Sequence, residues 1–305
     1  NLTKPDISII TNIGSSHLGN FKNLSDVALA KSEIFYGMKK DGIVILPGDS
    51  KHLDILKSEA RNHGLKNLFF FGTDNNHDCF IISKRNRYNI IEVTVSIMGE
   101  KLSFKINSHQ NHNILNTAAA ILASKTLGLT NKEIDQSLSV FNSGERRGKI
   151  YYLDHPSGSK VTLVDDSYNA SYESTSSALK SLRNLSLSKP LLILGDMLEL
   201  GKFSAQEHKK LIPIIKNTNP RLVIFIGEAM SEISKEINSH FDCICFESSQ
   251  KAEKEIPNLI KNNDLVLIKG SNGMNLNLIT SAIINFFKKL KLNNNIHTKE
   301  QNYAV

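Results

Sequence analysis

The chain has 305 residues, of which 40% are hydrophobic and 22% charged, and its formal net charge is +7 at pH 7. This length and composition are typical of a globular protein with two domains of ordinary size. No apolar run is long enough to span a membrane and no basic-then-apolar leader opens the sequence, so we expect a cytoplasmic protein without membrane insertion. The excess lysine does not alternate with aromatic residues, and no nucleic acid partner is predicted.

Short β-rich runs alternate with helical patterns in the first 72 residues. The run ISIITNI precedes a helical pattern over 26–38, and the run GIVIL precedes another from about Lys51, before the run LFFFG. This alternation predicts βαβ units and a mainly parallel sheet. Three strand-like runs with turn signals between them follow over 79–107, so we expect a small antiparallel meander there.

One lysine lies in an unexpected position in the first helical pattern. With Ser25 as N-cap and a rotation of about 100° per residue, Lys31 falls within an apolar sector of the helix. The sector is formed by Val27, Ala30, Ile34, Phe35 and Met38. A lysine on such a face usually extends its ammonium to solvent. If Lys31 is instead buried, desolvation lowers its pKa, and the neutral amine can add carbon dioxide to give a carbamate that binds Mg²⁺ through oxygen.

Two helices and a polar segment end the first half of the chain. The first helix is expected from about His112 to the stop at Gly128, and the second after Thr130. The segment NSGERRGK contains glycines and arginines but no apolar residue, which is typical of a linker. We therefore predict domains over residues 1–145 and 146–290, followed by a polar, frayed tail over 291–305.

The βα alternation restarts after this segment and predicts an α/β fold for the second domain as well. Strands are expected at KVTLVDD, PLLILGD, RLVIFIG and DLVLIKG, each followed by a helix. These helices begin near Glu173, near Ala205, after Gly227 and near Asn275. The pattern predicts a doubly wound, Rossmann-like domain.

Polar side chains follow four of the predicted strands, and ligands bind at the carboxyl ends of the strands in doubly wound sheets. Taken singly, each of these residues is as easily explained as a cap or a turn, and His17 alone is more often a loop histidine than a metal ligand. Their joint occurrence indicates a site. The residues are Asn12, His17, Asp165, Asp166, Tyr168, Asn169, Asp196, Glu199, Lys269 and Ser271.

Several motifs, in this order and spacing, resemble the ATP-dependent Mur ligases from residue 1 to about residue 290. They are TNIGSSHL, ALAKSEIF, HNILNTAAA, GERRG, DDSYNAS, GDMLELGKFSAQEH and KGSNGM. DDSYNA and GDMLELG are the most specific, and they resemble the members that add D-alanyl-D-alanine to a UDP-N-acetylmuramoyl-tripeptide. The resemblance implies a domain for the uridine nucleotide, a central ATPase domain and a C-terminal Rossmann-like domain. This chain would contain the distal part of the central ATPase domain and the whole C-terminal Rossmann-like domain.

The resemblance also implies the reaction and its cofactors, ATP and Mg²⁺. ATP would phosphorylate the tripeptide carboxylate, and the amine of D-alanyl-D-alanine would attack the acyl phosphate through a tetrahedral intermediate. Metals and cationic side chains are needed because anionic oxygens crowd such a site. The enzyme would be a cytoplasmic monomer that makes peptidoglycan precursors.

Roles carry over from the family residue by residue. As catalytic metal ligands, the resemblance implies His17 for one Mg²⁺ and Lys31, as a carbamate, for the second. For ATP it implies Asn113 and Asn116 near the adenine. It places Arg146 at the phosphates, with Arg147 as the alternative if the register slips by one. It places Asp166 at the ribose, with Tyr168 and Asn169 in the same loop. For the dipeptide it implies Lys269, whose ammonium would pair with the carboxylate, together with Ser271 and Asp196.

The sequence departs from the family pattern at several positions. Gln110 stands in place of a glycine, Ser171-Tyr172 in place of Asn-Pro, and Asn272 in place of an arginine. The phosphate-binding pattern G-x-x-x-x-G-K-[ST] and an acidic metal ligand before TKPD are also missing. We therefore expect an N-terminally truncated chain that is inactive by itself.

Two other interpretations remain open. One is another amide ligase of the same superfamily with a different amine acceptor, either a different Mur-type ligase or a folylpolyglutamate synthase-like protein, although GDMLELG argues against it. The other is a nucleotide- or peptide-binding fragment without catalysis, which the missing phosphate loop favours for the chain as given.

Overall fold

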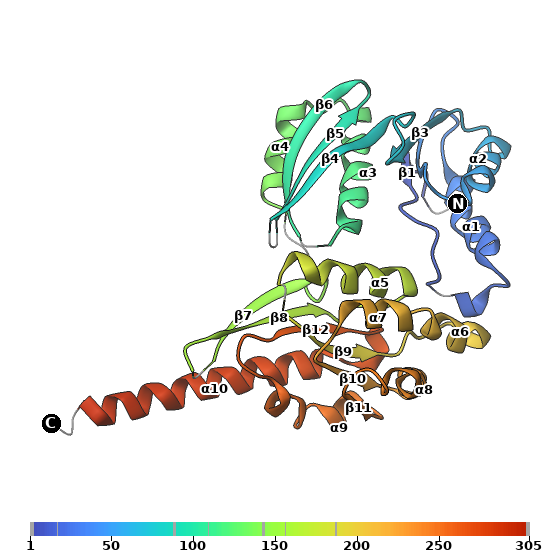
Figure 1. Ribbon diagram of the computed structural model, residues 1–305. Coiled ribbons are helices and arrows are strands. Elements are labelled where there is room, and N and C mark those ends of the chain that lie inside the picture. Colours follow the sequence, from blue (N-terminus) through green and yellow to red (C-terminus); the bar gives the residue numbers. More distant parts are fainter. Residues whose placement is uncertain are drawn as a thin grey trace. The chain divides into compact units, whose positions relative to one another are not determined.

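The computed structural model describes residues 3–302, apart from residues 17, 88, 89, 109, 142, 143, 156 and 187. The chain divides into two compact units, residues 1–142 and residues 143–305. Each unit is built on a six-stranded sheet of its own (Figure 1). Among the described residues, no helix combines the length and the apolar character that a membrane span requires.

The sheet of the first unit follows the order of the sequence. Its strands are β1 (Ile7–Ile9), β2 (Ile43–Pro47), β3 (Asn67–Gly72), β4 (Cys79–Arg87), β5 (Ile90–Ile97) and β6 (Glu100–Asn107). Strands β1 to β4 pair in parallel, whereas β4, β5 and β6 pair antiparallel. Both the parallel part and the antiparallel meander are confirmed.

The first helix of this unit differs from the prediction. Helix α1 spans Leu24–Ser32 and is followed by a 3-10 turn, η2, at Glu33–Gly37. The side chain of Asn23 accepts the backbone N–H of Asp26, so the N-cap is Asn23 and the prediction of Ser25 was wrong. Asn23 precedes Ser25 by two residues and is an equally good cap by residue type, which is why the sequence alone did not separate them.

Three further helices of the first unit agree with the sequence patterns: α2 (Leu53–Asn62), α3 (His112–Thr126) and α4 (Asn131–Ser139). The short 3-10 turn η1 (Leu18–Asn20) was not predicted. Gly128, at φ +88°, follows the end of α3, and Thr130 forms a capping box with Glu133 at the start of α4. The core lies between α3 and the meander, where alternate residues of β5 face inward. They are Ile91, Val93, Val95 and Ile97.

The sheet of the second unit has the order β11-β10-β9-β12-β8-β7. The strands are β7 (Lys149–Asp154), β8 (Lys160–Asp166), β9 (Leu191–Gly195), β10 (Leu222–Ile226), β11 (Cys243–Phe246) and β12 (Leu265–Lys269). All neighbours are parallel except β7, which pairs antiparallel with β8 and was not predicted. Because the chain returns to insert β12 between β8 and β9, the carboxyl ends of these three strands lie next to one another at the point where ligands bind in such folds.

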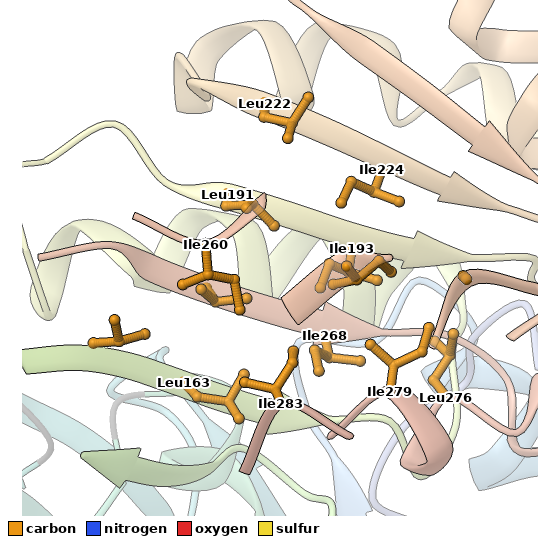
Figure 2. Packing of buried hydrophobic residues seen from close by; sticks show 14 of the residues in the cluster. Leu163, Leu191, Ile193, Leu222, Ile224, Ile260, Ile268, Leu276, Ile279 and Ile283 are labelled. Carbon is orange, nitrogen blue, oxygen red and sulfur yellow. The ribbon is translucent and has the colours of Figure 1, made fainter. Parts of the chain in front are cut away.

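Helices cover both faces of this sheet (Figure 1). They are α5 (Tyr172–Ser181), η3 (Leu182–Asn184), η4 (Gly201–Phe203), α6 (Ser204–Lys209), α7 (Ile212–Thr218), α8 (Glu228–Ile237), α9 (Ser249–Ala252), η5 (Ile256–Leu259), η6 (Asn272–Met274) and α10 (Asn277–Asn302). Figure 2 shows Ile279 and Ile283 of α10 among strand residues such as Leu163, Ile193 and Ile268, all buried. Full burial of each such side chain contributes about 1.5–3 kcal/mol. Helix α10 continues to Asn302, past residue 290, where a frayed tail was expected to begin.

Candidate functional site

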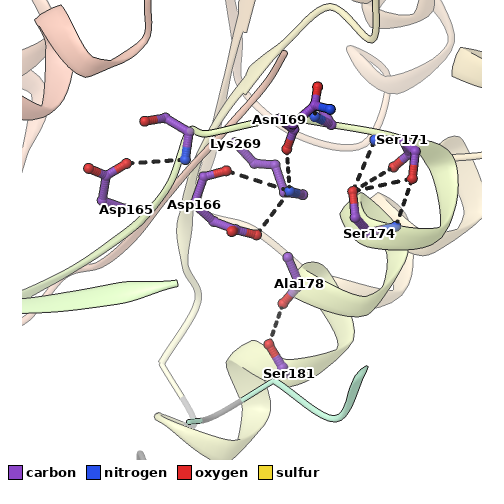
Figure 3. A network of polar contacts seen from close by, with 10 residues as sticks. Asp165, Asp166, Asn169, Ser171, Ser174, Ala178, Ser181 and Lys269 are labelled. Atoms are coloured by element: carbon purple, nitrogen blue, oxygen red, sulfur yellow. Dashed lines mark hydrogen bonds and ion pairs between the residues drawn. The ribbon is translucent and has the colours of Figure 1, made fainter. Parts of the chain in front are cut away.

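A buried ion pair joins the carboxyl ends of β8 and β12. Asp166 and Lys269 are the last residues of these strands and stand opposite each other in the sheet. Lys269 Nζ lies 2.9 Å from Asp166 Oδ2, and the two side chains are only 2% and 10% exposed (Figure 3). Nζ also donates to the Asn169 carbonyl over 2.8 Å and lies 3.5 Å from the Asp166 carbonyl. Because an ammonium carries three N–H bonds, these three acceptors account for all of them.

The loop after β8 is held at both of its ends. Asp165 Oδ1 accepts the backbone N–H of Ser167 over 3.1 Å, and burial raises the pKa of the Asp165 carboxyl above its ordinary value. At the other end, Ser171 and Ser174 form a reciprocal capping box that starts α5 (Figure 3). The departure from Asn-Pro at Ser171 therefore leaves the helix start well defined, since the serine supplies its own cap.

Two arginines stack on Tyr168, which is 40% exposed in this loop. The guanidinium carbon of Arg147 lies 3.9 Å from the ring centroid, and that of Arg146 lies 5.5 Å from it. The Tyr168 N–H donates to the Arg146 carbonyl over 3.0 Å. Arg146 has a left-handed backbone with φ of +59°, an unusual conformation for an arginine that often marks a functional position. The structure thus brings both candidate arginines to Tyr168.

The turn over residues 269–272 connects three separate segments. Lys269 holds the loop after β8, as described above. The backbone N–H of Ser271 donates to the Asp196 carbonyl over 3.1 Å, and Ser271 Oγ accepts the N–H of Leu198 over 2.9 Å, which fixes the loop after β9. Asn272 Oδ1 accepts a hydrogen bond of 3.0 Å from Arg146 Nη2. We call residues 269–272 the hub turn.

Gly270 allows the hub turn to approach β9 closely. A Cβ atom at Gly270 would clash with Leu276 Cδ1 and would lie 3.0 Å from the Cα of Gly195. The two glycines therefore let the ends of β9 and β12 come together without a side chain between them.

Asp196 caps a neighbouring helix. Its carboxylate accepts the N–H of Met230 over 2.7 Å and that of Ala229 over 3.3 Å, at the N-terminus of α8. Gly227 has a φ of +105°, and a Cβ atom there would overlap the Asp196 carboxylate. Asp196, for which a substrate contact is predicted, thus also caps the N-terminus of α8.

His208, which was not predicted as a site residue, supports the loop after β9 through Met197. The ring is fully buried, and its Nε2 accepts the backbone N–H of Met197 over 3.0 Å. Its Nδ1 lies 2.8 Å from the Ser204 carbonyl. Because Nε2 accepts, Nδ1 must carry the proton that bonds to Ser204, so these backbone groups select one neutral tautomer. No local pattern distinguishes a buried histidine of this kind from a surface one.

In the first unit, Lys31 is exposed, and the expectation that it faces the core was wrong. Its Nζ donates to the Asn12 carbonyl over 2.8 Å, in the segment that follows β1. The buried residues of α1 are instead Val27, Ala28 and Ser32. Lys31 follows Val27 by one helical turn, so its stem starts beside the buried residues while its ammonium extends outward to the Asn12 carbonyl.

The expected metal partner of Lys31, His17, lies outside the described residues. Within the described part of the chain, no three His, Cys, Asp or Glu side chains gather into a metal-binding group. Of the two residues expected at the adenine, Asn113 donates from Nδ2 to Ser108 Oγ over 2.8 Å in the first turn of α3. Asn116 follows three residues later on the same side of the helix and is exposed.

Comparisons with known proteins agree with this architecture. The family model of the Mur ligase middle domain matches residues 1–124, and that of the Mur ligase, glutamate ligase domain, matches residues 153–272. The UDP-N-acetylmuramoyl-tripeptide--D-alanyl-D-alanine ligase of Buchnera aphidicola subsp. Baizongia pistaciae is 32% identical over 94% of this chain and 61% of that protein. The enzyme of the same name from Bacillus subtilis is 30% identical over 93% of this chain and 60% of that protein.

Solved structures share the fold. MurF from Acinetobacter baumannii superposes with a TM-score of 0.81 at 21% identity, covering 92% of this chain and 60% of that one. The MurF ligase of Thermotoga maritima in complex with ADP superposes with a TM-score of 0.78 at 22% identity, covering 94% of this chain and 64% of that one. The chain thus spans about three fifths of the length of the relatives that it matches.

Proposed function

The chain belongs to the Mur ligase family, with the middle domain followed by the glutamate ligase domain, and we propose that it forms part of a MurF-type ligase. Such an enzyme uses ATP to join D-alanyl-D-alanine to a UDP-N-acetylmuramoyl-tripeptide. The hub turn is the observation that best supports this proposal, because it draws the loops after β8 and β9 and the arginine of GERRG together at one sheet edge. These are the motifs by which the sequence resembles this type of ligase.

We propose nucleotide-binding residues in each unit, with each unit considered by itself. Asn113 and Asn116 contribute from α3 in the first unit. Asp166 receives the ribose, and Tyr168 and Asn169 line the same loop. Arg146 reaches the phosphates, because its left-handed backbone and its bond to Asn272 hold the guanidinium at the hub turn while several of its five N–H donors remain to bind oxygen.

The dipeptide is proposed to bind near Ser271 and the loop after β9. Asp196 shapes that loop through its carbonyl, which accepts from Ser271, and through its cap on α8. Lys269 contributes through the loop after β8, which it holds by its bond to the Asn169 carbonyl. Correct placement of the attacking amine is worth several kcal/mol in such a reaction, so residues that fix these loops contribute to catalysis without touching the substrate.

Mg²⁺ is the metal proposed for this reaction, with His17 and a carbamate on Lys31 as ligands. As an ammonium, Lys31 cannot bind a cation. As a carbamate it would present oxygens, which Mg²⁺ prefers, and its remaining N–H could still donate to the Asn12 carbonyl. When bound, the metal would supply charge stabilisation for the phosphate oxygens.

Binding measurements on this chain test the acceptor side of the proposal. Isothermal titration with D-alanyl-D-alanine, D-glutamate, L-lysine and diaminopimelate, each with Mg²⁺ and ATP present, compares the amines used by different amide ligases. We expect the dipeptide to bind best. Preferential binding of D-glutamate or of diaminopimelate would assign the chain to another type of amide ligase.

We further propose that the ligase acts in the cytoplasm as a monomer without nucleic acid, and that this chain alone does not turn over ATP.

A further inference from the structure

The surroundings of Lys269 do not suit a residue that binds a ligand. Its side chain is 2% exposed, and its three N–H bonds point at Asp166 Oδ2, the Asn169 carbonyl and the Asp166 carbonyl. A ligand carboxylate could reach Nζ only by displacing one of these acceptors. It would also approach the negative charge of Asp166, and like charges at such short range repel strongly in a buried site.

The positions of the acceptors indicate a different role. Asp166 and Asn169 are three residues apart, and the ammonium binds both ends of the segment that they delimit (Figure 3). Within this segment Ser167 is 1% exposed, whereas Tyr168 is 40% exposed. The chain therefore bends around the ammonium and directs the Tyr168 ring outward.

Tyr168 connects this bend to the arginines. Its ring stacks against Arg147, at 3.9 Å from the guanidinium carbon, and its N–H bonds to the Arg146 carbonyl. A change in the bend would move Tyr168 and with it the contacts of both arginines. Lys269 thus acts on the outer part of the site through the loop that it holds.

We propose that Lys269 is a positioning residue that sets the loop over residues 166–169 and does not contact the dipeptide carboxylate. This inference rests on the proposed function only for the identity of the dipeptide. The shape of the loop can be tested on the chain itself, without any ligand.

A tryptophan reporter tests the loop. The chain has no tryptophan, so Tyr168→Trp introduces a single fluorophore at the tip of the loop. We expect Lys269→Met in this background to shift the emission to longer wavelength and to increase quenching by acrylamide, because the ring loses its fixed position. Lys291→Met is the matched control, since it removes an ion pair to Asp154 whose members are 60% and 50% exposed, and it should leave the emission unchanged. Emission and quenching that are the same with and without Lys269 would overturn the proposal.

A second variant keeps this test valid if Lys269→Met does not fold. The double variant Asp166→Asn/Lys269→Met removes both charges and so leaves no unpaired buried ion. It still lacks the bond to the Asn169 carbonyl, so we expect the same red shift and stronger quenching. Circular dichroism establishes that the reporter variants are folded. An unshifted spectrum in the folded double variant would also contradict the role of Lys269.

A ligand pair tests whether Lys269 touches the dipeptide. D-Alanyl-D-alanine and its C-terminal amide differ only in the carboxylate, so the ratio of their dissociation constants measures how strongly the protein recognises that charge. We expect Lys269→Met to leave this ratio unchanged, even where both affinities fall. A ratio that drops to one in Lys269→Met would show that Lys269 binds the carboxylate. If the parent chain binds neither compound, the proposed function fails for this chain, and the tryptophan reporter still decides the role of Lys269.

Discussion

Arg146 Nη2 donates to Asn272 Oδ1 over 3.0 Å, although 126 positions separate the two residues in the sequence. The bond ties the start of the second unit to the hub turn. It also gives a physical reason for the asparagine at position 272, where an arginine was expected. A second guanidinium there would face the first and repel it, whereas the amide oxygen accepts its hydrogen bond.

We expect Asn272→Ala to loosen the segment around Arg146. Loss of this hydrogen bond is worth about 1 kcal/mol, which corresponds to a roughly fivefold rise in the open population of the segment. Trypsin should therefore cleave after Arg146 or Arg147 about fivefold faster, as followed by mass spectrometry. Asn258→Ala is the control, because Asn258 is exposed and its side chain donates to the Lys254 carbonyl, four residues earlier in the chain. Equal cleavage rates in the two variants would show that the Arg146–Asn272 bond does not hold the segment.

We expect His208→Phe to destabilise the second unit. Phenylalanine fills a similar volume but leaves the buried N–H of Met197 and the carbonyl of Ser204 without the partners that they have in the parent. The expected loss is about 1–3 kcal/mol in the free energy of unfolding, measured in urea. Hydrogen exchange at the Met197 amide should accelerate at the same time. The exposed His240 gives the control, since His240→Phe should change stability by less than about 0.5 kcal/mol. A small effect of His208→Phe would mean that the loop after β9 does not depend on this ring.

Asp165 should lower the free energy of unfolding of the second unit as the pH rises, which is the opposite of the usual effect of a carboxyl group. Burial raises its pKa above the ordinary value of 3.8, and the nearby charge of Asp166 adds to the effect, while the hydrogen bond from the Ser167 N–H opposes it. Between the unfolded and the raised folded pKa the native protein holds more protons than the unfolded chain, so this group lowers stability as the pH rises.

Asp165→Asn tests this sign, because the amide keeps an oxygen for the Ser167 N–H but does not ionise. We expect the free energy of unfolding of the variant, relative to that of the parent, to be higher at pH 7 than at pH 4. Asp154→Asn is the opposite control, since a hydrogen bond from Lys291 lowers the pKa of that exposed carboxyl. The ionised Asp154 carboxyl stabilises the fold above its unfolded pKa, and this effect is lost as the pH falls. Asp154→Asn should therefore lower the free energy of unfolding more at pH 7 than at pH 4. A pH-independent effect of Asp165→Asn would contradict the assigned role of burial.

Lys31 should take up carbon dioxide. In ¹³C-bicarbonate with Mg²⁺, we expect a carbamate carbon resonance from the chain that disappears in Lys31→Ala. Lys39→Ala should retain the signal, because a hydrogen bond to Asp6 raises the pKa of Lys39 and keeps it protonated. In an active ligase, Lys31→Ala should be nearly inactive and partly restored by short-chain carboxylic acids. A carbamate signal that persists in Lys31→Ala would place the modification elsewhere.

The sequence predicted the fold well because its main signals are local. Apolar runs of the length of a strand, the antiparallel meander over 79–107 and the stop at Gly128 can each be recognised from a few neighbouring residues. Strand β7 was not predicted, since KIYYLD follows the polar segment directly and its pairing with β8 is not visible in its own pattern. Lys31 was wrongly expected to be buried, because the position of a residue around a helix does not show how far a long side chain extends toward solvent.

The structure brings several of the predicted site residues close together, because topology places the ends of β8, β9 and β12 side by side. Their roles in ligand binding stay predictions, and most of their partners inside the protein were not predicted. Which residue binds which depends on contacts across long stretches of sequence. Lys269 reaches Asp166 across 103 positions, Arg146 reaches Asn272, and Asp196 reaches the start of α8. No periodicity or spacing encodes these pairings, so the sequence did not predict the contacts that Lys269 and Asp196 make inside the protein.

Product formation is the most direct test of the proposed ligase activity. The measurement uses the longest natural polypeptide that contains this chain, with UDP-N-acetylmuramoyl-tripeptide, D-alanyl-D-alanine, ATP and Mg²⁺, and follows the product by mass spectrometry. We predict the UDP-N-acetylmuramoyl-pentapeptide together with one ADP for each amide formed. ADP-forming ligation of another amine, with none of the dipeptide joined, would contradict the account.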